Sequence, residues 1–321
     1  MIPALVLTAG HATRLRPLSF VRAKAAVPVA GEPLARRILR GLAAAGVTDA
    51  VLNLHHLPHT LTSLIGDGAD AGVRVRYSWE VPLLGSAGGP RRALPLLGAS
   101  FVIVNGDTLA DIDIAAVVAD HRRSGALVTM AVVPNLEPEK YGGVIVNAEG
   151  VVTGFESRRR SVAPSPRRTL APSFHFVGVQ VAEAEAFATV PDATPYESVG
   201  ALYPALMAQR PGSVRACVTS GGFLDIGTPD DYLQTSLLLG SREGRTTHGR
   251  NTRVHASARV EDSVLWDDVE VGEGTLLRQC IVTDGVRVPA DTSWIGVTMR
   301  QPNGELAPGE RVIEGLAISS L

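Results

Sequence analysis

The sequence predicts an α/β fold in which a parallel sheet covered by helices is followed by a short β-helix. In the first two-thirds of the 321-residue chain, short apolar runs alternate with segments of helical periodicity. Strand, loop and helix in repeated order are typical of a parallel sheet with helices on its faces. Past residue 252, apolar residues instead recur roughly every six residues, a spacing that suits the inward positions of stacked β-helix coils.

The first part of the chain supplies the elements of the predicted sheet. Strands are expected at 4–8, 50–54 and 101–104, and helices at 33–45 and 112–121. Pro33 suits a first helical turn and Gly46 suits a helix end, which sets the limits of the first helix. The strand at 101–104 is apolar at every position, so we expect it to be buried on both faces of the sheet.

The pattern changes at about residue 137, where we expect an inserted lobe. Its strands are predicted at 144–146, 151–155 and 174–181 and its helices at 182–187 and 196–209, before a short closing helix at 230–238. The polar connector 241–252 is a plausible domain boundary. The predicted division is therefore a first domain 1–240, a linker 241–252 and a β-helix domain 253–321 of two to four coils. Its inward positions are Val254, Val260, Val269, Val271, Ile281, Val286 and Val288.

Composition excludes several classes of protein. With 45% hydrophobic residues, 19% charged residues and a net charge of −2, the chain fits a soluble protein with more than one core. A nucleic-acid-binding protein would usually be more basic, and the basic cluster at 158–168 is too local for such a footprint. Cys217 and Cys280 fall in separate elements, which argues against a disulfide framework or a metal site. No apolar stretch spans a bilayer and no basic flank precedes the first one, so we expect a cytoplasmic protein.

The stretch from Leu7 to Leu34 carries the strongest chemical signal. An apolar run ends there at a turn of small residues whose backbone amides, with Thr13, Arg14 and Lys24, are suited to hold a polyphosphate. The spacing matches neither G-x-x-x-x-G-K-[ST] nor G-x-G-x-x-G. The stretch therefore indicates nucleotide chemistry of another kind.

This stretch resembles the signature loop of sugar-1-phosphate nucleotidyltransferases, A-G-G-x-G-T-R-L-x-P-L-T followed by P-K-P. The matching positions are Gly10, Thr13, Arg14, Leu15, Pro17, Leu18 and Lys24. The second and third glycines are replaced in the region of His11 and Ala12, and the prolines beside the lysine are Ala23 and Ala25. Because glycine is favoured at positive φ, Ala12 fits this loop only if its backbone conformation is ordinary.

The resemblance continues along the chain in the same order and implies roles for further residues. Asp107, in V-x-N-G-D, and Asp225, in D-I-G-T-P, match the two aspartates that bind Mg²⁺ in this family; on their own, they would be turn or helix-cap residues. The resemblance also implies a Rossmann-like mixed or parallel sheet and a left-handed hexapeptide β-helix. It gives Arg14, Lys24 and Asp107 catalytic roles.

Binding residues are carried over position by position. Leu84–Gly89 resembles the L-G-T-A-G segment, Tyr141–Val144 resembles Y-G-x-V, and Phe155–Arg158 stands where relatives have F-x-E-K-P. The nucleotide-binding set is Leu7, Ala9, Gly10, His11, Ala12, Thr13, Arg14, Gly85, Ser86, Ala87, Gly88, Asn105 and Gly106. The sugar-phosphate-binding set is Gly142, Glu156, Arg158 and Glu197, although Glu197 equally suits an exposed first helical turn.

The resemblance implies an enzyme that uses Mg²⁺ to join a nucleoside triphosphate to a sugar 1-phosphate, releasing pyrophosphate. The L-R-P-L and Y-G-G-V forms favour a mannose-1-phosphate guanylyltransferase-like protein, with uridylyl or thymidylyl transfer as alternatives. A non-catalytic regulatory paralogue that binds a nucleotide sugar is the alternative of a different class.

The β-helix and the adjacent histidines leave two smaller questions. A structural or dimer-forming role is expected for the β-helix, since exposed coil ends favour burial against another surface. A separate acyltransferase activity is the less favoured alternative, because His255 is the only histidine of this segment. His55 and His56 are expected to be loop or nucleotide-pocket residues, because neighbours in an extended segment point to opposite faces.

Overall fold

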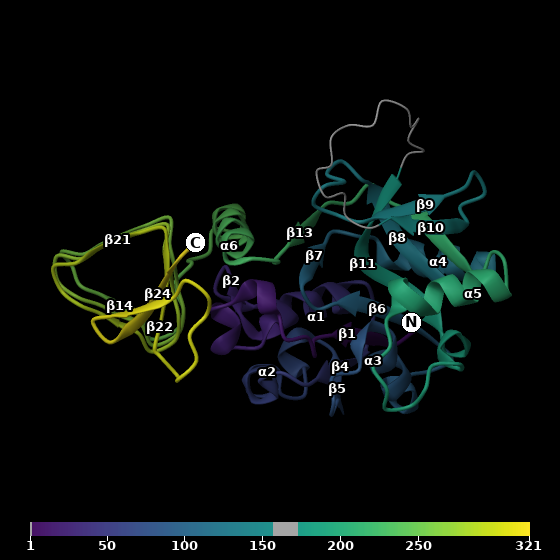
Figure 1. Cartoon of the computed structure of the whole chain (residues 1–321), viewed down its shortest axis with the longest axis horizontal. Coiled ribbons are helices and arrows are strands. Elements are labelled where there is room, and N and C mark those ends of the chain that lie inside the picture. The colour runs from purple at the N-terminus through teal and green to yellow at the C-terminus, as the bar shows by residue number, and fades with distance from the viewer. Residues whose placement is uncertain (1, 157–172) are drawn as a thin grey trace. The chain divides into compact units, whose positions relative to one another are not determined.

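The computed structural model describes residues 2–156 and 173–321, and these fall into two compact units (Figure 1). The first, here the sheet unit, comprises residues 1–10, 38–55 and 66–223; the second, the β-helix unit, comprises residues 11–37, 56–65 and 224–321. The chain passes between the two units five times, first within the signature stretch, between Gly10 and His11, and last between Phe223 and Leu224. The predicted domains 1–240 and 253–321 stay a prediction.

The sheet unit contains a nine-stranded mixed sheet. Its strands are β1 (Ala4–Leu7), β4 (Asp49–Leu54), β5 (Arg74–Trp79), β6 (Ser100–Asn105), β8 (Val128–Pro134), β9 (Gly143–Val146), β10 (Val152–Glu156), β11 (Ser173–Glu183) and β12 (Val214–Val218). The order is β10-β9-β11-β6-β1-β4-β5, and β8 pairs with β11 and β12. The parallel centre β6-β1-β4-β5 confirms the predicted arrangement, and the antiparallel β11 makes the sheet mixed.

Four helices of the described residues accompany this sheet along the chain: α1 (Leu34–Ala44), of which residues 34–37 belong to the β-helix unit, α3 (Gly85–Ala93), α4 (Ile114–Ser124) and α5 (Tyr203–Gln209). The core contains apolar side chains from both strands and helices, such as Leu5, Phe101 and Tyr203. The rings of Phe101 and Phe187 stack with centroids 5.9 Å apart. The apolar runs at 4–8 and 101–104 are thus buried, as their composition predicts.

Three predictions for the region past residue 137 need correction. Strands β9 to β12 belong to the main sheet and do not form an inserted lobe. The expected helix at 182–187 is the end of β11 followed by a single 3₁₀ turn, Ala184–Phe187. The expected helix at 196–209 is a π-helical turn, Ser198–Leu202, followed by the short α5. Whether such a segment becomes a strand or a helix depends on its partners in the folded protein, and the periodicity of the local sequence carries no information about those partners.

The β-helix unit begins with three 3₁₀ turns, at Thr13–Leu15, Leu18–Phe20 and Lys24–Ala26, and a hairpin of β2 (Pro28–Val29) and β3 (Glu32–Pro33). Helices α2 (Pro58–Ile65) and α6 (Pro229–Glu243) also belong to it. The Thr228 hydroxyl caps α6 by accepting from the Asp231 amide, 3.1 Å away. Helix α6 is longer than predicted and includes the first three residues of the expected linker.

The β-helix itself has the predicted architecture, and Figure 1 shows its coils stacked as triangles. Three parallel ladders join successive coils, with pairs such as Arg253 with Glu270 lying 17 residues apart. The ladder strands are β14 (Arg253–Val254), β15 (Arg259–Glu261), β16 (Val264–Leu265), β17 (Glu270–Val271), β18 (Leu276–Arg278), β19 (Ile281–Val282), β20 (Arg287–Val288), β21 (Ser293–Ile295) and β22 (Val297–Arg300). Two antiparallel strands, β23 (Arg311–Ile313) and β24 (Leu316–Ser320), close the stack.

Most predicted inward positions of the β-helix are buried. Val269, Val271, Ile281, Val286 and Val288 are each less than 5% exposed. Val254 is 37% exposed and Val260 is half-buried, so the inward prediction fails for Val254 in the first coil. A terminal coil has a stacking partner on one side only, so its apolar residues lack the burial that later coils receive.

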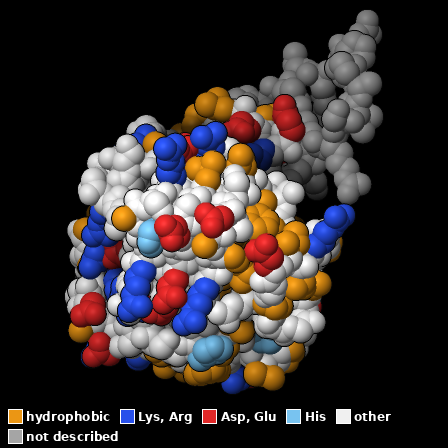
Figure 2. Space-filling view, turned by 90° about the vertical axis from the view of Figure 1, so that its left-hand side faces the viewer, with side chains coloured by type: hydrophobic (Ala, Val, Ile, Leu, Met, Phe, Trp, Pro, Cys, Tyr) orange, Lys and Arg blue, Asp and Glu red, His pale blue; other side chains and the backbone are white. Residues whose placement is uncertain are grey.

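Charges on the coils are paired along the ladders. Glu270 contacts Arg253 at 3.4 Å and Arg287 at 3.2 Å, and Arg278 contacts Glu261 at 2.7 Å. Figure 2 shows basic and acidic side chains mixed across one face of the molecule. A nucleic-acid-binding face is expected to be mainly basic.

Two predictions on cysteines and membrane spans can be compared directly with the described residues. Cys217 is half-buried, Cys280 is buried, and both are free thiols in different units. Among residues 2–156 and 173–321, no helix combines the length and the apolar composition needed to cross a bilayer.

Candidate active site

The Asn105-Gly106-Asp107 turn lies directly against the end of β1. The Gly106 amide donates to the Leu7 carbonyl at 2.9 Å, and a Cβ at Gly106 would lie 2.5 Å from the same oxygen. Only glycine fits this contact, so the turn brings Asp107 beside the first residues of the signature stretch. Parallel strands β1 and β6 end here together, which is where α/β sheets hold their ligands.

Two buried polar residues that the sequence analysis missed lie beneath this edge. The Asn53 side chain accepts from the Thr8 amide at 2.6 Å and donates to Glu80 at 2.7 Å. Glu80, 1% exposed, also accepts from the Leu84 amide at 2.8 Å. This network joins the first turn after β1 to the glycine-rich segment at 84–89. The sequence did contain a signal for this network: an asparagine lies within the apolar run of β4, and a buried amide side chain needs hydrogen-bond partners.

The glycine-rich segment forms the start of α3, where its small residues pack closely against neighbouring segments. A Cβ at Gly89 would meet Glu80 at 2.5 Å, and one at Gly88 would meet the Thr194 carbonyl at 2.8 Å. The amides of Ala87 and Gly88 both donate to the Tyr196 carbonyl, at 2.9 and 3.2 Å. These two predicted nucleotide contacts are therefore buried, and their amides already have partners.

Gly85 and Ser86 are half-exposed, and they lie beside another predicted residue, Glu197. The Ser86 hydroxyl donates to the Glu197 carboxylate at 2.6 Å and accepts from the Ser198 amide at 2.8 Å. Gly85 has φ +76°, and a Cβ there would meet Glu197 at 2.7 Å. The structure thus joins a residue of the nucleotide set to one of the sugar-phosphate set.

Gly142 and Glu156, both predicted to bind the sugar phosphate, also lie together. Gly142 directly precedes β9, and a Cβ there would be 3.0 Å from the Glu156 carbonyl; in the antiparallel pair β9-β10, Glu156 is paired with the next residue, Gly143. Arg158, the third member of this set, lies outside the described residues, as does the basic cluster at 158–168.

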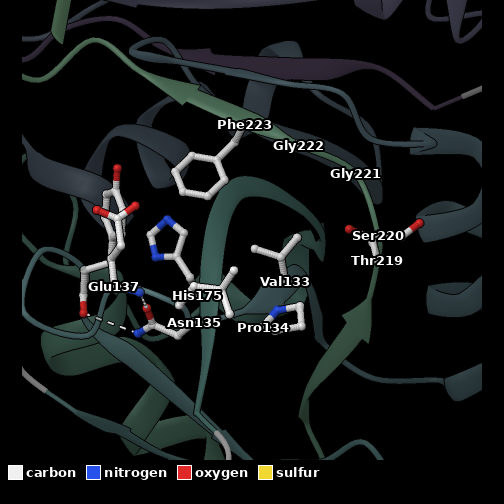
Figure 3. Close-up of a pocket in the computed structure, with 12 residues that line it drawn as sticks. Val133, Pro134, Asn135, Glu137, His175, Thr219, Ser220, Gly221, Gly222 and Phe223 are labelled. Carbon is white, nitrogen blue, oxygen red and sulfur yellow. Dashed lines mark hydrogen bonds between the residues drawn. The ribbon is translucent and has the colours of Figure 1, made fainter.

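A pocket of about 440 Å³ opens beside this hairpin, past the carboxyl ends of the parallel strands β8 and β12 (Figure 3). The Tyr141 and His175 rings pack with centroids 4.3 Å apart, and Phe223 packs 4.7 Å from His175. Figure 3 shows His175 and Phe223 next to each other, with Thr219 and Ser220 on the other side. A pocket of this size with aromatic walls and a few polar groups is typical of a small-molecule site.

In the β-helix unit, two predicted residues converge on Gly227. The point where a Cβ would stand lies 3.1 Å from Asp225, 3.2 Å from Arg14 and 3.2 Å from Asp231. A side chain in place of Gly227 would therefore disturb all three charged groups. Asp231 was not predicted, and its position in the first turn of α6 was the available signal.

The turn after β1 is open to solvent. Gly10, His11, Thr13 and Arg14 are exposed, whereas Ala9 is buried. The His11 ring packs edge-on against His56, 5.5 Å away, and His56 contacts the Ser19 carbonyl at 2.8 Å. His55 instead contacts the Glu80 carbonyl at 2.9 Å, so the two adjacent histidines have separate surroundings, as predicted.

Ala12 does not have the ordinary conformation that the sequence analysis requires of it. Its φ of 49° and ψ of 47° are left-handed, at the start of the first 3₁₀ turn. Alanine stands here where the motif that the stretch resembles has glycine, and an L-residue adopts this conformation at a cost of about 1–2 kcal/mol.

We expect Ala12→Gly to stabilise the protein by about 1 kcal/mol, because glycine adopts this conformation without the Cβ clash. Urea unfolding followed by circular dichroism measures the change. Ala23→Gly is the matched control: Ala23 has φ −53°, so the glycine should destabilise by increasing the freedom of the unfolded chain. Equal changes in the free energy of unfolding for the two substitutions would contradict a conformational cost at Ala12.

Asp107 lies in the turn that follows β6, whereas Asp225 is the last residue of the short strand β13 (Phe223–Asp225), and the two belong to different units. Carboxylate oxygens are ligands that suit Mg²⁺, which usually completes its shell with phosphate oxygens and water. Within the described ranges, no group of three or more histidine, cysteine or acidic side chains is arranged around one metal position.

Comparison with known proteins identifies the family of the chain. Residues 3–242 match the Nucleotidyl transferase family, and residues 234–305 match the C-terminal hexapeptide of GlmU-like proteins. The chain is 28% identical to the mannose-1-phosphate guanylyltransferase of Mycobacterium tuberculosis, over 90% of this chain and 82% of that protein. It is 27% identical to the UTP–glucose-1-phosphate uridylyltransferase of Synechocystis, over 95% and 80%.

The fold has close counterparts among solved structures. The crystal structure of HddC from Yersinia pseudotuberculosis superimposes with a TM-score of 0.64 at 20% identity, covering 74% of this chain and 100% of that one. Sequence match, sheet topology and hexapeptide coils agree, and the chain belongs to the nucleotidyl transferase family, as one of its enzymes.

Proposed function

We propose that this enzyme transfers a nucleotidyl group from a nucleoside triphosphate to a sugar 1-phosphate, giving a nucleotide sugar and pyrophosphate. GTP and mannose 1-phosphate are the proposed pair. The similarity to a mannose-1-phosphate guanylyltransferase over 90% of the chain carries the proposal. The uridylyltransferase relative of nearly equal identity makes UTP the alternative nucleotide.

The chemistry requires positioning and charge neutralisation more than a protein nucleophile. An oxygen of the sugar phosphate forms a bond to the α-phosphorus of the triphosphate, and the bond from that phosphorus to the pyrophosphate oxygen breaks. Lys24 is proposed to contact the α-phosphate, and Arg14 to balance the charge that develops on the departing pyrophosphate. Asp107 and Asp225 are the residues that would hold Mg²⁺, which would supply further neutralisation of the phosphate charge.

For the sugar phosphate, the contact of Gly142 with Glu156 supports a binding position on the β9-β10 hairpin. The Glu156 carboxylate is suited to accept sugar hydroxyls, and the absence of a side chain at Gly142 permits close approach. Glu197 is proposed to act together with Ser86, because one of its oxygens already accepts the serine hydroxyl.

Pyrophosphate release across a matrix of nucleoside triphosphates and sugar 1-phosphates tests the function. We expect release to require both substrates and Mg²⁺, with kcat/KM for GTP at least about tenfold above that for UTP or dTTP. Fastest release with another base would contradict the guanylyl assignment. Binding without release in every combination would contradict the transfer reaction and favour the regulatory paralogue.

The predicted homodimer and cytoplasmic location stay predictions. His255, on which a separate acyltransferase activity would depend, is exposed and contacts the Ser257 hydroxyl at 2.9 Å. That contact gives no support for a second active site.

A further inference from the structure

Arg22 joins the signature stretch to the β-helix through a buried ion-pair cluster. Its Nε donates to Asp284 at 2.7 Å, and its Nη2 donates to Asp284 at 2.7 Å and to Asp267 at 2.9 Å. The whole residue is 7% exposed. Asp267 and Asp284 stand 17 residues apart, at equivalent positions of successive coils, so one guanidinium clamps two coils.

A second connection reaches the same stretch from the other side. The fully buried Trp266 donates its indole N–H to the Tyr232 hydroxyl at 2.8 Å. That hydroxyl donates in turn to the Pro28 carbonyl at 2.5 Å. Because Trp266 directly precedes Asp267, residues 22 and 28 are both tied to one corner of the β-helix.

Lys24 lies between these two connections. It is half-buried, at the start of a single 3₁₀ turn, and Ala23, Ala25 and Ala26 around it are buried. The Ala23 amide donates to the Thr60 hydroxyl at 3.0 Å, and the Ala26 carbonyl accepts from Arg22 at 3.4 Å. A turn of this length has few internal bonds, so its position depends on such outside contacts.

We propose that Arg22 is a positioning residue for nucleotidyl transfer, and that the β-helix, through Asp267 and Asp284, fixes the segment that carries Lys24. This inference rests on the proposed contact of Lys24 with the α-phosphate. It gives the β-helix a part in the reaction, beyond the structural or dimer-forming role that its sequence predicts.

The acidic and basic charges of this cluster are equal in number. Two aspartates face two guanidinium groups, since Arg250 donates to Asp267 at 2.8 Å from the preceding coil. Burial raises the pKa of the Asp284 carboxyl above its usual range, although Arg22 opposes the shift. A half-buried carboxylate of this kind favours the conformation in which Arg22 stays beside it. Lysine has one charge but cannot bridge two carboxylates with a planar fork.

The test compares Arg22→Gln with Arg250→Gln in the full-length protein. Both substitutions remove a guanidinium from Asp267, but Arg250 belongs to the β-helix and its side chain is 76% exposed. For Arg22→Gln we expect kcat to fall about 10- to 100-fold, the loss typical of removing a group that orients a reacting one. Arg250→Gln should keep kcat within about twofold, and Arg22→Lys should recover part of the loss.

Hydrogen exchange of backbone amides in residues 18–28 gives a readout that does not depend on activity. Exchange there should rise in Arg22→Gln and stay unchanged in Arg250→Gln. If Arg22→Gln does not fold, the triple variant with Asp267→Asn and Asp284→Asn removes the uncompensated carboxylates, and its kcat should remain low.

The outcomes separate this inference from the proposed function. A wild-type protein that releases no pyrophosphate from any substrate pair contradicts the proposed function. In that case, hydrogen exchange of residues 18–28 still tests whether Arg22 anchors this segment to the β-helix. Wild-type kcat in Arg22→Gln, or equal loss of kcat in the two glutamine variants, would overturn the positioning role. So would unchanged exchange in residues 18–28.

Discussion

Replacing Asp107 with alanine is expected to lower kcat by about 10³-fold or more. A metal that neutralises developing charge contributes several kcal/mol to the transition state, and each 1.36 kcal/mol is a factor of ten in rate. Asp107 is proposed to hold that metal, and it lies in the turn that Gly106 fixes against the end of β1. The loss should appear in kcat at saturating substrate, measured as pyrophosphate release.

The fold should tolerate this substitution. Asp107 is half-buried, and its side chain accepts from the adjacent Thr108 hydroxyl at 3.2 Å. We expect the free energy of unfolding to change by about 1 kcal/mol or less. Asp107→Asn separates charge from shape, because the amide is nearly isosteric but a poor magnesium ligand; it should need far more Mg²⁺ for any residual rate.

Asp111→Ala is the matched control, because Asp111 follows in the same segment and is exposed. Its kcat should stay within about twofold of the wild-type value. Wild-type kcat in Asp107→Ala would remove the metal assignment. An equal fall in both variants would instead indicate general damage to the segment 105–111.

Local pattern predicts much of this fold because the relevant physics is local. The apolar runs of β1 and β6 require burial on both faces, and Pro33 and Gly46 limit α1 to within one or two residues of its observed ends. Apolar residues likewise recur in the β-helix because each coil places a side chain in the interior at an equivalent position. The lobe expected past residue 137 fails because strand partners, which lie far away in sequence, decide whether β9 to β11 join the main sheet.

The candidate site is predictable where a motif has a local geometric requirement and unpredictable where it depends on distant partners. Gly106 must be glycine for the contact with Leu7, so N-G-D correctly marks a close approach. At Ala87 and Gly88 the motif did not indicate a further role, because both amides donate to the Tyr196 carbonyl and a Cβ at Gly88 would meet the Thr194 carbonyl; their nucleotide contacts stay a prediction. Ala12 shows a third case, in which the backbone adopts a left-handed conformation that the residue type does not indicate.

Long-range polar contacts are the largest group that sequence reasoning missed. Asn53 with Glu80, and Arg22 with Asp267 and Asp284, join residues separated by 27 and up to 262 positions. Each side chain alone is an ordinary polar residue in its own segment. The fold brings these residues together, and the sequence of any single segment does not show which distant residue will be its partner.

The buried pair of Arg300 and Glu310 follows the same rule and should carry a large share of the stability of the β-helix unit. Both side chains are at most 1% exposed, and they form two bonds of 2.8 and 2.7 Å. Arg300 also donates to Asn303 at 2.7 Å and to the Glu305 carbonyl, and Glu310 accepts from the Ala307 amide at 2.8 Å. The pair therefore organises the whole connection between β22 and β23.

We expect Arg300→Met to destabilise the unit by about 3–5 kcal/mol, because it leaves the Glu310 carboxylate buried without its partner. The double variant Arg300→Met/Glu310→Met should lose much less, since no unpaired charge remains. Urea unfolding followed by tryptophan fluorescence reports on this unit through Trp266 and Trp294, in a Trp79→Phe background, because the third tryptophan lies in the sheet unit. Arg278→Met is the control: its pair with Glu261 is similarly short, at 2.7 Å, but both side chains are more than 40% exposed, so the loss should be about 1 kcal/mol or less. Equal losses for Arg300→Met and Arg278→Met would show that burial of the pair does not set its energetic weight.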